Sequence, residues 1–164
     1  MPAAQPFILR GDECLNGAPY SMIGNTLRLK LVASDHAGSA TVMVNTVAAH
    51  NGPPLHVHPF EESFYILEGM FVFEIDGAAH TAGPGDFVHV PANVPHVFQN
   101  TADHDGRYVI LIRPAGVENF FAACAAHAIS NPNDVAAMNA LGESYGIKVL
   151  GPPIAGRRRQ APTQ

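Results

Sequence analysis

The stretch LHVHPFEESFYILEG, residues 55–69, is the most informative part of this sequence. His56 and His58 stand two residues apart, so in an extended strand both imidazole rings point to the same face. Glu62 has the same parity four residues further on, whereas Glu61 has the opposite parity and is expected to face away. Two neutral nitrogens and a carboxylate oxygen that converge from one short segment suit a divalent first-row metal ion.

A histidine further along the chain completes the predicted metal site. His96 begins a β-rich segment after the proline-rich turn at 91–95, and an antiparallel barrel can bring it beside the first three side chains. A single histidine on a strand is more often a surface or core residue than a ligand. The pattern H-x-H-x-x-x-E with a spaced fourth residue is much more specific. The sequence therefore predicts a site of three histidines and one glutamate.

Short β-rich segments separated by turn residues surround this site. The predicted strands are 26–31, 41–47, 55–58, 63–68, 70–75, 78–82, 87–90, 96–100 and 107–113. The first two are expected to form a hairpin, and Asp76-Gly77 is a strong signal for a second hairpin. The last two are expected to pair with each other across a polar turn. About eight short strands with this spacing predict an all-β sandwich or closed barrel.

After Pro114 the apolar residues recur with the period of a helix. Glu118 falls on the polar face of this first predicted helix. Asn131-Pro132 is typical of the start of a second helix, which Gly146 ends. The expected regions are an N-terminal arm with short strands (1–25), a barrel core (26–114), a helical extension (115–150) and a flexible tail (151–164).

The composition limits the class of protein. A chain of 164 residues with 47% hydrophobic and only 14% charged residues indicates one globular domain rather than disorder or a coiled coil. A net charge of −5 argues against broad binding to nucleic acid or to an anionic membrane. No apolar run is long enough to span a bilayer, and Cys14 and Cys124 cannot form a disulfide framework. We therefore expect a cytoplasmic protein.

The predicted metal ligands and the turn residues around them resemble the two sequence motifs of single-domain cupins. The first motif is matched by His56, His58, Glu62 and Gly69, and the second by Gly85, Pro91, His96 and Asn100. The resemblance covers residues 52–100. It implies a single antiparallel cupin β-barrel of the jelly-roll type, with the two C-terminal helices packed at one end. It also implies one divalent transition metal ion bound by His56, His58, Glu62 and His96. Iron, manganese, nickel, cobalt, copper and zinc all accept such ligands.

The sequence departs from the cupin pattern at two glycines. His50 stands where the first motif has a glycine, and Gly52 follows two residues later. Asn93 replaces the glycine of the second motif. Asparagine adopts left-handed backbone geometry more readily than most residues, so the turn is expected to be kept. Neither departure affects a predicted ligand.

Within this group, the chain is most similar to small bacterial quercetin dioxygenase-like cupins. The similarity lies in residues 62–69, the turn at 82–87 and the segment 145–153. This resemblance implies a metal-dependent dioxygenase that cleaves a flavonol-like or other aromatic, enolisable substrate. Glu62 would be both a ligand and the group that accepts the acidic hydroxyl proton of the substrate. The implied partners are an aromatic small molecule, dioxygen and a second copy of the chain.

Five apolar side chains are candidates for the substrate pocket, with ordinary barrel packing as the alternative for each. They are Phe60, Phe64, Phe98, Phe73 and Met43. Two other functions also remain open from the sequence. The same metal site could serve an isomerase, a decarboxylase or a hydrolase that needs no dioxygen, or the chain could bind a small molecule without catalysis.

Overall fold

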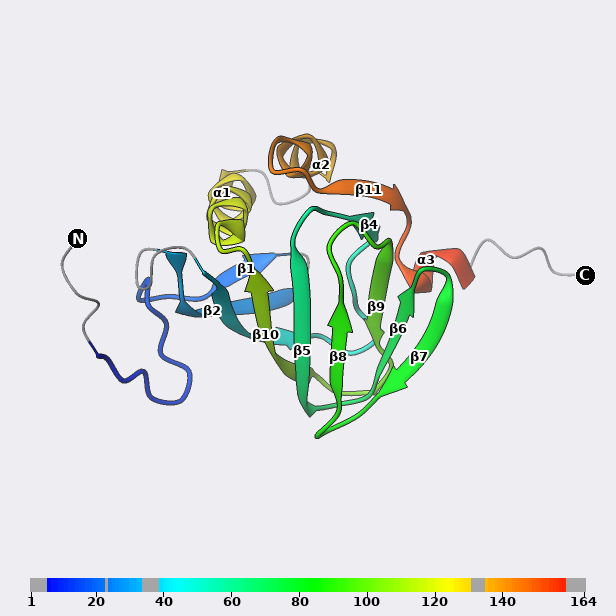
Figure 1. Cartoon of the computed structure of the whole chain (residues 1–164), viewed down its shortest axis with the longest axis horizontal. Coiled ribbons are helices and arrows are strands. Elements are labelled where there is room, and N and C mark those ends of the chain that lie inside the picture. Colours follow the sequence, from blue (N-terminus) through cyan, green and yellow to red (C-terminus); the bar gives the residue numbers. More distant parts are fainter. Residues whose placement is uncertain (1–5, 23, 34–38, 131–134, 159–164) are drawn as a thin grey trace, which may run out of the picture.

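The computed structural model describes residues 6–22, 24–33, 39–130 and 135–158, and its strands form two antiparallel sheets (Figure 1). In spatial order, the six-stranded sheet consists of β1 (Tyr20–Met22), β2 (Asn25–Leu31), β3 (Thr41–Val47), β10 (Gly106–Arg113), β5 (Glu61–Glu68) and β8 (Phe87–Val90). The five-stranded sheet consists of β11 (Lys148–Gly151), β4 (Leu55–Val57), β9 (His96–Asn100), β6 (Phe71–Ile75) and β7 (Ala78–Ala82). The helices are α1 (Val117–Ser130), α2 (Val135–Ser144) and α3 (Ile154–Arg158).

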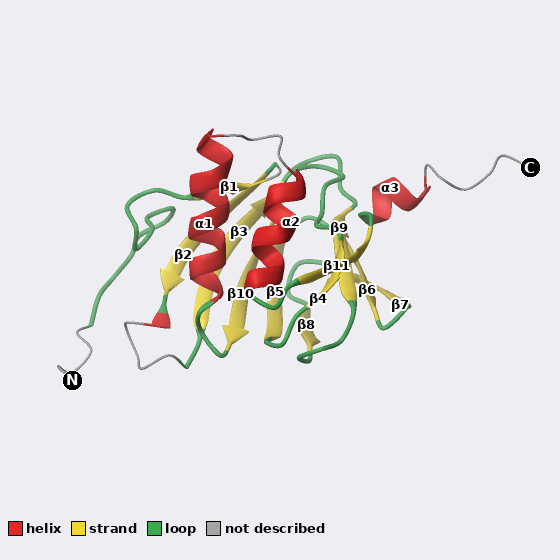
Figure 2. Ribbon diagram, turned by 90° about the horizontal axis from the view of Figure 1, so that it is seen from above, coloured by secondary structure: helices red, strands yellow, loops and turns green. Residues whose placement is uncertain are grey.

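This arrangement is an antiparallel jelly roll, which confirms the predicted fold class. The first two helices lie next to each other at one end of the strands, as predicted (Figures 1 and 2). Among the described strands, hydrogen bonds do not join the two sheets into one closed barrel. The sheets instead meet through a core of aromatic rings. Phe64 on β5 packs against Phe73 on β6 with a centroid distance of 5.2 Å, and against Phe98 on β9 at 5.8 Å.

Local sequence explains both predicted hairpins. Strand β3 alternates buried and half-buried residues along its whole length and pairs with β2, as its period of two predicts. Between β6 and β7, Asp76 and Gly77 have φ values of 49° and 79°. Two successive positive φ values are required by the type I′ turn that best matches the twist of a hairpin.

The predicted pairing of the last two strands is wrong. β9 pairs with β4 and β6, whereas β10 pairs with β3 and β5 in the other sheet. The polar segment between them therefore crosses from one sheet to the other. The fully buried Asn100 holds this crossing, because its Nδ2 donates to the carbonyl oxygens of Val47 at 3.1 Å and His104 at 2.8 Å, and its Oδ1 accepts from the backbone of Ala102.

Glu118 does not lie on a solvent-facing side of α1, contrary to the helical pattern. Its side chain is only 9% exposed and reaches the six-stranded sheet. Oε1 accepts a hydrogen bond from the backbone of Ala33 at 3.0 Å, and Oε2 accepts from the backbone of Gly116 at 2.8 Å and from the Thr41 hydroxyl. A carboxylate in the first turn of a helix also interacts favourably with the helix dipole. Glu118 thus anchors the start of α1 to the strands.

The chain continues past α2 with two elements that the sequence pattern did not indicate. β11 pairs with β4, and α3 packs on the sheet through Ile154, which is 3% exposed. The predicted helix start at Asn131-Pro132 and the last residues of the predicted tail lie outside the described residues. In the described part of the chain, no helix is both long and apolar enough to cross a membrane.

Candidate metal centre

The four predicted metal ligands come from both sheets and meet between them. His56 on β4 and His96 at the start of β9 are direct partners in the ladder between these strands. His58 follows β4 immediately, and Glu62 lies on β5 in the opposite sheet. The structure thus brings together all four side chains that the sequence singled out.

Each of the three imidazoles is oriented by a hydrogen bond to a nearby backbone carbonyl. Nδ1 of His56 donates to Pro54 at 2.7 Å. Nδ1 of His58 donates to Phe60 at 2.9 Å, and Nδ1 of His96 donates to Val94 at 2.9 Å. A carbonyl oxygen can only accept, so the proton of each neutral ring is on Nδ1 and the lone pair is on Nε2. Metal-binding histidines are typically oriented in this way.

The ring nitrogens that remain converge on one point. One ligand atom from each of His56, His58 and His96 lies within 4.8 Å of the others, in a group that could hold a metal ion. Glu62 lies beside this group, with Oε1 3.5 Å from Nε2 of His58 and Oε2 3.3 Å from Nε2 of His96. Nε2 of His58 is buried and has no hydrogen-bond partner in the described part of the chain. A buried lone pair without a donor is costly, and a bound cation would satisfy it.

The electrostatics of the group favour a neutral His56 and an ionised Glu62. Burial, reinforced by the charge of His96, lowers the pKa of His56 to about 4. Burial alone would raise the pKa of Glu62, but the adjacent imidazoles of His58 and His96 outweigh it and hold that pKa far below its usual range. Burial opposes protonation of His96, yet Glu62 reverses the effect and raises the pKa of His96. The negative charge of Glu62 between buried imidazoles would therefore be balanced by a proton or by a bound cation.

Two neighbouring residues fix the position of His58. The ring of Phe60 stacks on the imidazole with a centroid distance of 3.8 Å and an interplanar angle of 10°. The backbone N–H of Asn93 donates to the carbonyl of His58 at 2.8 Å. Asn93 has φ 63°, which confirms the predicted left-handed turn at the position where the cupin motif has a glycine. His50, the other departure from the motif, also has a left-handed φ of 59°.

The candidate ligands open into a cavity of about 510 Å³. His56, His58 and Glu62 line it, together with four of the five predicted pocket residues, Met43, Phe60, Phe64 and Phe98. Phe73 was predicted there too, but it is fully buried and packs behind Phe64 and Phe98 instead of lining the cavity. His89 on β8 is exposed and lies beside Ser63.

Sequence reasoning missed a further set of residues around this cavity. Asn45 on β3 and Tyr108 on β10 line it, and helix α1 contributes Val117, Phe120 and Phe121. Asn45 has the same strand parity as Met43, which was recognised, so alternation alone could have found it. The contribution of α1 depends on how the helix docks and has no such signal.

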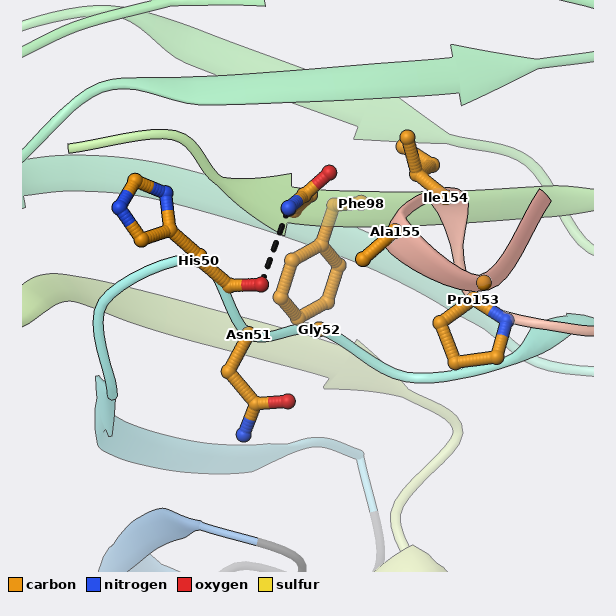
Figure 3. A pocket seen from close by; sticks show the side chains of 9 residues that line it. His50, Asn51, Gly52, Phe98, Pro153, Ile154 and Ala155 are labelled. Atoms are coloured by element: carbon orange, nitrogen blue, oxygen red, sulfur yellow. Dashed lines mark hydrogen bonds between the residues drawn. The ribbon is translucent and has the colours of Figure 1, made fainter. Parts of the chain in front are cut away.

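A smaller cavity of about 270 Å³ lies on the other side of Gly52 and Phe98 and is covered by α3 (Figure 3). His50 and Gln99 line it, and Nε2 of Gln99 donates to the backbone carbonyl of His50 at 2.9 Å. A Cβ on Gly52 would come within 2.0 Å of the Phe98 carbonyl oxygen. Gly52 therefore allows the loop after His50 to pass directly against β9, the strand that begins with His96.

Comparisons with known proteins agree with this geometry. A family model described as "Cupin domain" matches residues 43–112, which include all four candidate ligands. Quercetin 2,3-dioxygenase of Bacillus subtilis (strain 168) is 39% identical over 120 residues, which are 72% of this chain and 34% of that protein. The chain therefore spans about a third of the length of this relative.

Solved structures show the same fold at lower identity. A predicted oxalate decarboxylase from Thermotoga maritima has a TM-score of 0.57 at 22% identity, over 65% of this chain and 97% of that one. An RmlC-like cupin from Shewanella frigidimarina has a TM-score of 0.54 at 18% identity, over 64% of this chain and 91% of that one. At these identities the likeness shows the fold and not the reaction.

Proposed function

Because this chain belongs to the cupin family through residues 43–112, we propose that it is a metal-dependent dioxygenase of the quercetinase type. Its substrate would be a flavonol-like or other aromatic, enolisable compound. The observation that carries the proposal is a cavity of about 510 Å³ with candidate metal ligands at one wall and phenylalanine rings at others. The relative that is named as a quercetin dioxygenase and is 39% identical supports it.

The proposed cofactor is one divalent transition metal ion. His56, His58 and His96 would bind it through Nε2, and Glu62 through a carboxylate oxygen. The donor set fits, since each Nδ1 already donates to a carbonyl, and a cation would satisfy Nε2 of His58, which has no hydrogen-bond partner among the described residues. When bound, such an ion acts as a Lewis acid and holds two reactants together. Iron, manganese, nickel, cobalt, copper and zinc all accept these ligands.

Glu62 is proposed to accept the proton of the acidic substrate hydroxyl. Its carboxylate is ionised at neutral pH, because His58 and His96 hold its pKa well below the usual range. It lies at the cavity wall, so a hydroxyl placed against the metal site can donate a hydrogen bond to it. The proton then passes to the carboxylate oxygen that the hydroxyl contacts.

The phenylalanines are proposed to orient a planar ring. Phe60 is held in place by its stacking on His58, and Phe64 and Phe98 are fixed by the aromatic core. Aromatic rings pack on one another in offset or edge-to-face arrangements that fix orientation as well as burying apolar area. Such walls also exclude water from the reacting groups.

Oxygen uptake on addition of quercetin tests the proposal. The protein would be loaded separately with ferrous, manganous, nickel, cobalt, copper and zinc ions. With at least one ion, we expect oxygen uptake matched by loss of flavonol absorbance. Glu62→Gln should lower kcat by at least about 100-fold while the three histidines still bind the ion, as measured by elemental analysis. Glu61→Gln is the matched control, because Glu61 pairs with Arg113 at the surface and should stay within about twofold of wild type.

Three outcomes would contradict the proposal. No uptake with any bound metal removes quercetinase activity. Full activity of the Glu62→Gln protein removes the proton-accepting role. Consumption of substrate at the same rate without dioxygen would replace the dioxygenase by an isomerase, decarboxylase or hydrolase at the same site.

We also propose that the protein is a homodimer. β8 is an edge strand of its sheet, and exposed apolar side chains lie on it and on its neighbour β5: Phe87 is 66% exposed, Tyr65 46% and Leu67 37%. An exposed edge with apolar neighbours is a surface on which a second copy can pair. Sedimentation velocity should give a dimer for wild type and a monomer for Phe87→Asp. A wild-type monomer at micromolar concentration would contradict the proposed dimer. The cytoplasmic location stays a prediction.

A further inference from the structure

Two polar side chains face each other in the otherwise apolar part of the cavity. Asn45 on β3 and Tyr108 on β10 are direct partners in the ladder between these strands. Nδ2 of Asn45 donates to the Tyr108 hydroxyl oxygen at 3.2 Å. Both side chains line the cavity, although they are only 5% and 3% exposed. They belong to the six-stranded sheet, whereas the three histidines belong to the five-stranded sheet and the segment that follows β4.

The hydrogen bonding of this pair is incomplete. Oδ1 of Asn45 is buried and has no hydrogen-bond partner among the described residues. The Tyr108 hydroxyl accepts from Asn45, so its own proton is still available for donation. Burial, with a contribution from the charge of Glu62, raises the pKa of Tyr108 well above its ordinary value, so the phenol keeps this proton. A buried acceptor without a donor is costly and needs an explanation.

Asn45 and Tyr108 keep an unpaired hydrogen-bond donor and acceptor whichever way the Asn45 amide is oriented. As described, the pair leaves one acceptor, Oδ1 of Asn45, and one donor, the Tyr108 hydroxyl. If the amide were turned over, the hydroxyl would donate to Oδ1, and both amide N–H groups and a lone pair of the Tyr108 oxygen would remain. Either way, the pair offers at least one donor and one acceptor next to each other. A hydroxyl group can satisfy both, because it donates one hydrogen bond and accepts another.

We propose that Asn45 and Tyr108 bind a hydroxyl group of the ligand that occupies this cavity. The ligand hydroxyl donates to the amide of Asn45 and accepts from the phenol of Tyr108, which makes the pair a determinant of specificity. The inference rests on the proposed function in that it places the substrate in the same cavity as the metal ligands. It adds that the substrate is an aromatic compound with a hydroxyl group that contacts the cavity wall formed by Asn45 and Tyr108.

A purely structural role explains the pair less well. Neighbouring side chains on the cavity wall are apolar, among them Leu27, Met43 and Ile110. The Tyr108 ring already packs against Phe64 and Phe98 at centroid distances of 5.2 and 5.6 Å. An apolar residue of similar shape in place of Asn45 would avoid the unpaired oxygen, and replacing both polar partners is often neutral. The polar pair therefore contributes more to recognition than to packing.

Binding of 2-naphthol and 2-methylnaphthalene to the purified 164-residue chain tests this inference. The two probes differ by a hydroxyl in place of a methyl group. Their own fluorescence reports binding without tryptophan background, because the chain contains no tryptophan. The measured quantity is the ratio of the two dissociation constants. Because each variant is compared with wild type, differences in probe hydrophobicity and any contact with a bound metal cancel.

We expect Asn45→Leu and Tyr108→Phe each to reduce the preference for 2-naphthol by about tenfold, as loss of one or two neutral hydrogen bonds predicts. The double variant should lose little more than either single variant, because both residues bind the same hydroxyl. Asn25→Leu is the matched control. Asn25 lines the same cavity, but its Oδ1 already accepts from Asn51 at 3.3 Å, so the preference should not change.

The outcomes separate this inference from the proposed enzyme activity. An unchanged preference in Tyr108→Phe, which keeps the packed ring, would overturn the inference even if Asn45→Leu failed to fold. The inference would also be overturned if wild type bound neither of the two probes. Neither measurement involves dioxygen or turnover. A protein that prefers 2-naphthol through these residues but does not consume quercetin would keep the inference and remove the quercetinase.

Discussion

Replacement of Glu118 by Gln should destabilise the protein strongly, although the change is nearly isosteric. Glu118 uses both carboxylate oxygens, one for the backbone N–H of Ala33 and the other for the backbone N–H of Gly116 and the Thr41 hydroxyl. An amide has only one carbonyl oxygen, so one backbone N–H is left facing the N–H groups of the new side chain. A buried donor without an acceptor costs about 1–3 kcal/mol.

The remaining hydrogen bonds also lose the assistance of the negative charge, which adds about 1 kcal/mol. The expected loss in free energy of unfolding is therefore about 2–4 kcal/mol. With a urea m-value of about 2 kcal/mol/M, the midpoint should fall by roughly 1–2 M. Glu68→Gln is the control, because Glu68 is exposed and its carboxylate pairs with Arg107 at 3.4 Å on the surface, so its replacement should cost less than about 1 kcal/mol.

The pH dependence gives a second test of the same carboxylate. Burial opposes ionisation of Glu118, but the hydrogen bonds from Thr41, Ala33 and Gly116 outweigh it, and its pKa in the folded protein lies below the ordinary value of 4.5. A depressed folded-state pKa stabilises the protein above the unfolded-state pKa, and this contribution is lost as the pH falls through the folded-state pKa. The difference between wild type and Glu118→Gln should thus be constant above about pH 6 and should shrink below about pH 4.5. A midpoint shift under about 0.3 M at neutral pH, or a difference independent of pH, would refute the reasoning.

Three further predictions concern the metal centre and its supports. A divalent metal at about 100 times its dissociation constant should raise the free energy of unfolding of wild type by about 2.7 kcal/mol. The His58→Ala variant should lose most of this stabilisation. If the metal stabilised the variant as much as wild type, His58 would not be a ligand. Gly52→Ala should cost about 3 kcal/mol or more, because the new Cβ meets the Phe98 carbonyl oxygen at 2.0 Å; Gly151→Ala, with ordinary contacts of 3.7 Å and longer, is the control, and equal urea midpoints would contradict the expectation. Asn93→Val should cost about 1–2 kcal/mol because a β-branched residue resists the left-handed φ of 63°, whereas Asn93→Gly should be close to neutral; a stable Val variant would argue against backbone strain.

The clustering of the candidate ligands could be predicted because strand parity is a local property. His56 and His58 share a face through the period of two, and the proline-rich turn before His96 marks where β9 begins. Asn93 could be assigned a left-handed φ for a local reason too, since its side chain tolerates that geometry. In each case a few neighbouring residues decide the outcome.

Features that depend on distant partners could not be obtained in this way. Glu118 has a polar side chain on a helix, and only the docking of α1 brings it to Ala33 and Thr41. The crossing after β9 depends on Asn100, whose partners include a carbonyl 53 positions away in the sequence. A polar turn between two strands normally indicates a hairpin, and nothing local distinguishes it from a change of sheet.

The position of Glu62 gives the proposed metal a structural role as well. Of the four candidate ligands, Glu62 alone lies on the six-stranded sheet, and it meets His58 and His96 across the gap between the sheets. Backbone hydrogen bonds among the described strands do not join the two sheets, so a bound ion would add a direct link between them. Without a metal ion, the contact there depends on a proton between Glu62 and His96, whose pKa the carboxylate raises. Metal binding and closure of this side of the cavity should therefore be thermodynamically coupled, because the free energy of one contributes to the other.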